Sequence, residues 1–167
     1  MITTDRVRLV PMRGVEIRAP YLEALNDSET IRYMEAGRRP QTAESARAFL
    51  SGFSPPTGYV FRILTGVDVD VGNLTVRVKP TDQQADFGIL VWRQWWGTGA
   101  AAAALEEATR WAWGRGLSRL TFWTHNPRAA RLVARLGWTH EGTLRRNFLD
   151  NTGQWTDSEL YARLREE

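Results

Sequence analysis

The sequence predicts a mixed α/β (α+β) fold in which helices flank a mainly antiparallel central sheet that contains one parallel strand pair. Three β-rich segments, 59–64, 71–78 and 86–91, are separated only by short turn sequences, so neighbouring segments are expected to pair antiparallel. A helical stretch then connects 86–91 to another β-rich segment, 120–123. A crossover through a helix makes the two strands that it joins parallel.

The first 34 residues are expected to form one strand and two helical pieces. Alternating apolar residues over 6–11 predict the strand. Apolar residues in 21–25 predict a helix, and the polar cluster at 26–28 is typical of a helix cap. A second, short helix is therefore expected through 31–34.

A further helix is expected to begin at Thr42, which Ser45 follows at the spacing of a helix cap. Its apolar residues Ala46, Phe49 and Leu50 recur at spacings of three and four, so all three are placed on the inward face.

The C-terminal part is expected to form a helix and a hairpin. A helix over 127–136 begins with Pro127 and ends before Gly137, which suits the preferences of helix ends. Strands over 138–144 and 154–164 flank the turn sequence at 151–153. The expected order is a strand, a helical region in two pieces, a further helix, three strands, a helix, a strand, a helix and two strands.

The most informative stretch is the two-glycine turn before the alanine-rich helix that starts at Ala100. Gly97 and Gly99 leave the backbone bare where the first helical N–H groups have no partner, an arrangement that suits an anion. A glycine pair alone is weak evidence. The Lys-Ser/Thr of a nucleotide-triphosphate loop and the third glycine of a dinucleotide motif are both missing. Coenzyme A is the leading candidate among the remaining phosphate-bearing cofactors.

Composition limits the other possibilities. The 167 residues suit a single domain over 1–167. The lack of cysteine excludes disulfides, thiolate metal sites and a catalytic Cys, and no metal is expected. A net charge of +3 with dispersed arginines argues against nucleic-acid binding. Without a signal peptide or a long apolar run, we expect a soluble cytoplasmic protein with no membrane partner.

Five segments carry a resemblance to a known family. They are TDRVRLVPM, ALNDSETIRYM, DFGILVWRQWWGTGAAAAAL, THNPRAARLVARLGWTHEGTLR and GQWTDSELYARL. Together they resemble the GNAT superfamily of acyl-CoA-dependent N-acyltransferases, and within it the RimJ/RimL-like branch. Gln94, Gly97 and Gly99 stand in register with its (Q/R)xxGx(G/A) motif. The resemblance covers nearly the whole chain and implies a sheet whose parallel strand pair splays apart.

The resemblance also implies acetyl-CoA as co-substrate. The residues expected to contact it are Ile89, Leu90, Val91, Trp96, Gly97, Thr98, Gly99, Ala100 and Asn126. The backbone of the first three would pair with the pantetheine arm as if it were an added strand. The N–H groups of 97–100 would bind the pyrophosphate, and the Asn126 side chain would steady the cofactor near the thioester. The alternative for Asn126 is a helix cap.

Asp86 is the candidate catalytic base, because relatives carry an acid on this strand and an amine must lose its proton before attack. The alternative is a solvated carboxylate at the start of a strand. Ala129 and Val133 replace the family's serine and tyrosine, and 146–148 lacks the glutamate of RimL-like proteins. We therefore expect catalysis chiefly by positioning and by backbone stabilisation of the oxyanion, with water returning the proton to CoA.

The expected activity is direct acetyl transfer to a primary amine, either a protein N-terminus or a small molecule. The alternative, motivated by the missing hydroxyls, is a CoA-binding or interaction module with little turnover. A longer acyl donor is a further alternative, because the small side chains of 100–104 could leave room for it. A homodimer is a further expectation. His125 adjoins Asn126, yet a lone histidine is more often structural. The pairs Arg38-Arg39 and Arg145-Arg146 could bind an anionic substrate group or be plain surface charge.

Overall fold

The computed structural model describes residues 7–12 and 16–165, and its elements follow the expected order except for the short helix expected through 31–34. The strands are β1 (Arg8–Pro11), β2 (Gly58–Leu64), β3 (Asp70–Lys79), β4 (Gln84–Val91), β5 (Arg119–Thr124), β6 (Thr139–Leu149) and β7 (Trp155–Leu164). The helices are α1 (Ala19–Asn26), α2 (Ala43–Ser51), α3 (Ala100–Trp113) and α4 (Pro127–Arg135), with a 3₁₀ segment η1 (Glu35–Arg38).

All seven strands form one sheet in the order β1-β2-β3-β4-β5-β7-β6. Every neighbouring pair is antiparallel except β4 and β5, which are parallel as predicted. Their ladder is short, because it ends where Asp86 meets Thr121. Beyond that point β4 continues to Val91 and β5 to Thr124 without pairing with each other, so the predicted splay is confirmed.

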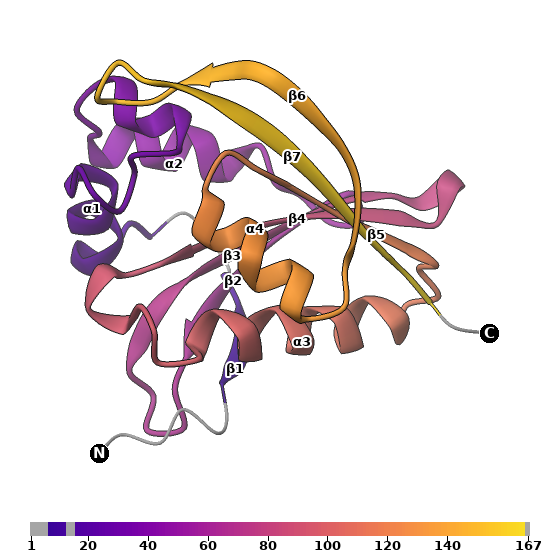
Figure 1. Cartoon of the computed structure of the whole chain (residues 1–167). Helices are drawn as coiled ribbons and strands as arrows, with labels where there is room; N and C mark the ends of the chain where they lie inside the picture. Colours follow the sequence, from indigo (N-terminus) through magenta and orange to yellow (C-terminus); the bar gives the residue numbers. More distant parts are fainter. Residues whose placement is uncertain (1–6, 13–15, 166–167) are drawn as a thin grey trace.

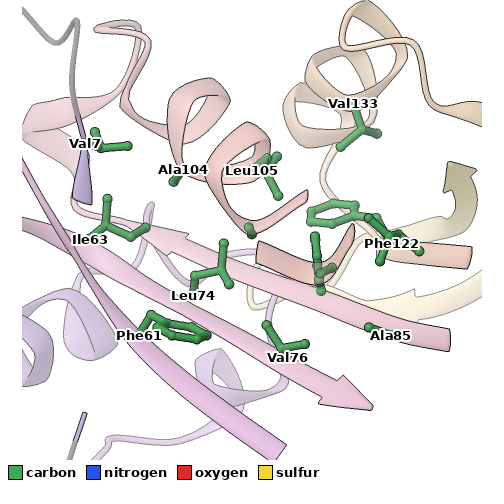
Figure 2. Packing of buried hydrophobic residues seen from close by; sticks show 14 of the residues in the cluster. Val7, Phe61, Ile63, Leu74, Val76, Ala85, Ala104, Leu105, Phe122 and Val133 are labelled. Carbon is green, nitrogen blue, oxygen red and sulfur yellow. The ribbon is translucent and has the colours of Figure 1, made fainter. Parts of the chain in front are cut away.

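Helices α3 and α4 cover one face of the sheet (Figure 1). The small residues Ala104 and Ala108 let α3 lie close to the strands, and Leu105 fills the space beside them. Figure 2 shows Ala104 and Leu105 above Leu74 of the sheet, with Val133 of α4 nearby. Because these residues are fully buried, this layer fixes the axis of α3 and therefore the position of its N-terminus.

A second apolar cluster lies on the opposite face of the sheet. Along β4, Phe87 belongs to the first cluster, under α3 and α4, whereas Leu90 belongs to the second. It also contains Tyr21 and Leu25 of α1, Leu50 of α2 and Trp92, among other residues. The tip of the β6–β7 hairpin extends to this side of the molecule, near α1 and α2 (Figure 1).

The structure corrects the expected short helix through 31–34. Its residues form turns, followed by η1. The Asp27 carboxylate does accept a hydrogen bond from the Thr30 N–H at 2.9 Å, as a cap would. However, Asn151 of the β6–β7 turn donates to the carbonyls of Ser28 and Arg32, which a continuing helix would need for itself.

Helix α2 begins as predicted, with Thr42 and Ser45 forming a reciprocal capping box. Ala46 and Leu50 are buried, whereas the prediction for Phe49 is wrong because 53% of its surface is exposed. Among the described residues, no helix is long and apolar enough to span a membrane.

Candidate active site

The splay between β4 and β5 opens into a cavity of about 270 Å³, here named the acceptor cavity. Ile89 and Leu90 line it from β4, and Asn126 lines it from the loop after β5. Other residues come from α1, α2, the turn before η1 and the neighbouring strands: Tyr21, Thr30, Tyr33, Met34, Phe49, Leu50, Asn73, Thr75, Gly88, Phe122, Trp123, Thr124, His125 and Ala129. The structure thus brings three of the predicted site residues together at one cavity.

Asp86 lies at the vertex of the splay, where β4 and β5 part. Its carboxylate accepts a 2.8 Å hydrogen bond from the Thr121 hydroxyl of β5. Burial raises the pKa of Asp86, although this hydrogen bond opposes the rise. The carboxylate is therefore not the freely solvated group of the alternative interpretation, but Asp86 is not among the residues that line the acceptor cavity.

The glycine turn has the geometry expected at the start of α3. Gly97 and Gly99 have φ of +74° and +90°, values that L side chains rarely adopt. Their N–H groups donate no hydrogen bond to any described residue. The Thr98 N–H makes a long 3.5 Å contact with the Trp95 carbonyl, and the Ala100 N–H makes a 3.4 Å contact with the Thr98 hydroxyl. Within the described part of the chain, the Gly97 and Gly99 amides thus have no hydrogen-bond acceptor, and the Thr98 and Ala100 amides make long contacts.

Trp96 anchors this turn to the end of β4, because its indole Nε1 donates to the Val91 carbonyl at 2.9 Å. The Val91 carbonyl therefore already has a partner within the protein. Ile89 and Leu90, which precede it, lie in the unpaired part of β4 on the side of β5. The free edge is shorter than the sequence suggested, but it begins next to the acceptor cavity.

Asn126 caps α4 and also lines the acceptor cavity. Its Oδ1 accepts a 2.9 Å hydrogen bond from the Arg128 N–H and so caps α4. Its Nδ2 donates to no described residue, and the side chain lines the acceptor cavity. The cap holds the amide in one orientation, which leaves an N–H donor at the mouth of the splay.

A second cavity of about 160 Å³ lies beside Trp96 and the N-terminus of α4, and we name it the basic cavity. It shares Tyr33 and Asn126 with the acceptor cavity, so the two are neighbours. Arg128 and Arg131 line it, and the Arg128 guanidinium lies 5.2 Å from the centre of the Trp96 ring. Sequence reasoning missed these arginines, although their spacing of three places both on one face of α4.

His125 also lines the acceptor cavity, and buried contacts hold its ring. Its Nδ1 lies 2.7 Å from the hydroxyl of the fully buried Ser158, which also accepts a 2.7 Å hydrogen bond from the Asn147 side chain. The ring stacks on Phe148 with centres 4.2 Å apart. Burial lowers the pKa of His125 below its ordinary 6.5, so the imidazole is neutral at pH 7.

The two residues that replace the family's serine and tyrosine lie in different surroundings. Ala129 lines the acceptor cavity, whereas Val133 is fully buried in the core under α4 and faces neither cavity. Arg38 lies over the Phe148 ring, on which His125 stacks, and Arg146 lies over the Trp155 ring of the β6–β7 hairpin. His140 pairs with Glu159 on β7 and lies outside the site.

Comparison with known proteins agrees with this geometry. A family model for an acetyltransferase (GNAT) domain matches residues 6–139. A search of curated proteins finds no match. Among solved structures, a protein from T. thermophilus described as a candidate acetyltransferase is 27% identical, with a TM-score of 0.73, over 95% of this chain and 85% of that one.

Two structures with bound CoA are more similar in shape but less similar in sequence. RimL, a ribosomal L7/L12 alpha-N-protein acetyltransferase, gives a TM-score of 0.83 at 17% identity over 97% of this chain and 96% of that one. The spermidine N-acetyltransferase from Vibrio cholerae, in complex with CoA and spermine, gives 0.82 at 17% identity over 95% of each chain. At this level of identity the likeness shows a shared fold.

Proposed function

Because this chain belongs to the GNAT family of acetyltransferases, we propose that it transfers the acetyl group of acetyl-CoA directly to a primary amine, with residues 1–167 as one catalytic domain. The observation that carries the proposal is the unpaired edge of β4 beyond Asp86, next to the free amides of Gly97 and Gly99. We also propose that the chain belongs to the RimJ/RimL-like branch. The five segments that resemble this branch occur in the branch's order along the sequence, and the RimL structure has the same fold.

The chain's own groups fit acetyl-CoA along its length. The Gly97 and Gly99 N–H groups and the positive end of α3 would bind the pyrophosphate. The edge at Ile89 and Leu90 would pair with the pantetheine arm, which has amide groups like a peptide strand. Arg128 and Arg131 in the basic cavity would neutralise a further phosphate. When bound, the cofactor supplies an activated acetyl group as a thioester.

The reaction needs an uncharged amine at the acceptor cavity. A new bond forms between the amine nitrogen and the acetyl carbon, the carbon–sulfur bond breaks, and the amine loses one proton while the CoA sulfur gains one. We assign the first proton transfer to Asp86 acting through water, because Asp86 is near the cavity but does not line it. Its raised pKa makes it a stronger base than an ordinary aspartate. With Ala129 and Val133 at the usual hydroxyl positions, water protonates the sulfur.

Exchanging Gly97 tests the pyrophosphate site. A Cβ at Gly97 would meet no atom within 4 Å, and the same holds for Gly116 beyond the other end of α3, where φ is +77°. Asn and Asp tolerate such φ better than other residues, so Gly97→Asn and Gly97→Asp differ mainly in charge. Calorimetry with CoA should show at least ~10-fold weaker binding for Gly97→Asp than for Gly97→Asn.

The matched control pair is Gly116→Asn and Gly116→Asp, which should bind CoA with equal affinity. Equal affinity of the two Gly97 variants would contradict the pyrophosphate assignment. Thiol release from acetyl-CoA with a panel of amines then separates the enzyme from a CoA-binding module. Tight CoA binding without turnover on any amine would favour the module.

Three finer points remain predictions. The acceptor is either a protein N-terminus, as the RimL structure suggests, or a small amine, as the spermidine enzyme suggests. The acetyl donor is expected to be preferred over longer acyl donors, which a series of CoA thioesters would test. A homodimer is expected, and sedimentation velocity would measure it.

A further inference from the structure

We propose that the acceptor is an amine with a single positive charge on an uncharged, aromatic or apolar body, and that polyamines are poor substrates. This inference rests on the proposed acetyl transfer and concerns the substrate class of the same cavity. It is carried by one property of the acceptor cavity: the described residues that line it are aromatic, aliphatic or neutral polar.

No carboxylate or guanidinium occurs among the described residues of this lining. Two titratable groups of the lining, His125 and Tyr21, are neutral at pH 7. His125 is uncharged because burial lowers its pKa, and burial raises the pKa of Tyr21 to about 12, which keeps its hydroxyl protonated. The ammonium of an acceptor would therefore find no counter-charge on the cavity wall.

Two groups of charges behind the lining, next to Asn73 and next to His125, are paired or mixed in sign. The carboxylate of Asp86, the proposed base, serves the reacting amine. Arg18 donates to the Asn73 side chain at 3.0 Å and forms a salt bridge with Asp70, which Arg62 also contacts. Near His125 the opposite charges of Glu35 and Arg38 act on the imidazole in opposite directions. Neither group supplies the net negative charge that would attract a second ammonium.

Aromatic surface is exposed in the same cavity. Phe49 of α2 and Trp123 of β5 line it and are 53% and 46% exposed. Large apolar side chains left open in a concave site are typical of ligand-binding surfaces. An aromatic or aliphatic substrate body would cover them and remove this apolar surface from water, which favours binding.

The reacting amine itself needs no permanent counter-ion, because it attacks as the neutral form. A second ammonium stays charged throughout the reaction, and transferring it from water into an uncharged cavity is costly without a carboxylate partner. The volume of about 270 Å³ admits an arylalkylamine, or the first residue of a peptide with an apolar side chain. Charge and shape thus point to the same substrate class.

The test compares amines that differ by one charge. We expect kcat/KM for phenethylamine and for pentylamine to exceed that for cadaverine, the diamine matched to pentylamine, by at least ~10-fold. Equal or higher kcat/KM for cadaverine or spermidine would overturn the inference and leave acetyl transfer intact. Calorimetry of the same amines on the CoA-loaded protein gives the order of their affinities even if turnover is absent. Failure of the substrate inference can therefore be distinguished from failure of the proposed acetyl transfer.

Two variants sharpen the test. Trp123→Ala should lower kcat/KM for phenethylamine by ~10-fold with little change in the KM for acetyl-CoA. The control is Trp155→Ala, because Trp155 is an exposed tryptophan of β7 outside the cavity. This control should change neither quantity. Tyr33→Glu, which introduces a carboxylate into the lining, should raise the cadaverine-to-pentylamine ratio of kcat/KM. An unchanged ratio in a folded Tyr33→Glu variant would contradict the electrostatic argument.

Discussion

Asp86 is subject to two opposing requirements. At the vertex of the splay, burial raises its pKa, which makes it a useful base but also makes its ionised form costly for the folded state. The Thr121 hydroxyl offsets part of this cost and fixes the direction of the carboxylate. A residue that stabilised the fold best at this position would be uncharged, so the carboxylate is better explained by chemistry than by stability.

We predict that Asp86→Asn lowers kcat by about 10²-fold and stabilises the protein at neutral pH. The pKa in the folded state is above that in the unfolded state, so the contribution of Asp86 to stability is present below its unfolded pKa of 3.8 and is lost as pH rises through the folded pKa. The stability gain should therefore be larger at pH 7 than at pH 3.5, measured by urea denaturation at both values. Unchanged pH–rate behaviour would remove Asp86 as the base.

At the scale of elements, the β6–β7 hairpin holds the segment that walls the acceptor cavity. Asp150 in its turn accepts a 2.9 Å hydrogen bond from Arg32, and Asn151 donates to the carbonyls of Ser28 and Arg32. Burial alone would raise the pKa of Asp150, but hydrogen bonds from Thr152, from the Gln154 N–H and from Arg32 hold it well below its usual range. These contacts fix the turn that carries Tyr33.

Asp150→Asn should therefore destabilise the protein by about 1–3 kcal/mol at pH 7. Because the folded pKa is depressed, the contribution of Asp150 is present above 3.8 and is lost as pH falls through the folded pKa. The difference in free energy of unfolding between this variant and the unaltered protein should shrink below pH 4, and denaturation curves would measure it. Asp157→Asn changes an exposed carboxylate in the same hairpin and is the control. A similar loss of unfolding free energy in both variants would show that the contact between Asp150 and Arg32 does not stabilise the protein.

At the scale of the whole molecule, two apolar layers on opposite faces of one sheet fix the splay and the N-terminus of α3 relative to each other. The net charge of +3 is modest, so attraction of an anionic cofactor depends on local placement of arginines rather than on the overall field. Arg128 and Arg131 supply such a local charge at the basic cavity.

Affinity for CoA should therefore fall as salt rises from roughly 0.05 to 0.5 M, since screening lengths shrink over this range. The variant with both Arg128→Gln and Arg131→Gln should bind CoA more weakly at low salt and show a smaller salt dependence. Arg110→Gln and Arg115→Gln, toward the far end of α3, are the matched control. Identical salt dependence in the two double variants would contradict a phosphate-binding role for α4.

The sequence predicted the order of elements and the parallel pair because these depend on local periodicity, short turns and the helical crossover between β4 and β5. It also located the glycine turn, whose positive φ values only glycine adopts readily. It placed Phe49 wrongly, since spacing alone cannot say how wide the buried face of α2 is. The hydrogen bonds that link Asn147, Ser158 and His125 could not be predicted from the sequence, because β6, β7 and the loop after β5 come together only in the folded protein.

The most direct test is a crystal structure with bound acetyl-CoA. We expect pyrophosphate oxygens within about 3 Å of the Gly97 and Gly99 nitrogens. We also expect the pantetheine amides to pair with the backbone at Ile89 or Leu90, and the thioester to lie at the mouth of the acceptor cavity beside Asn126. A cofactor bound elsewhere, or a thioester that points away from this cavity, would contradict the proposed site.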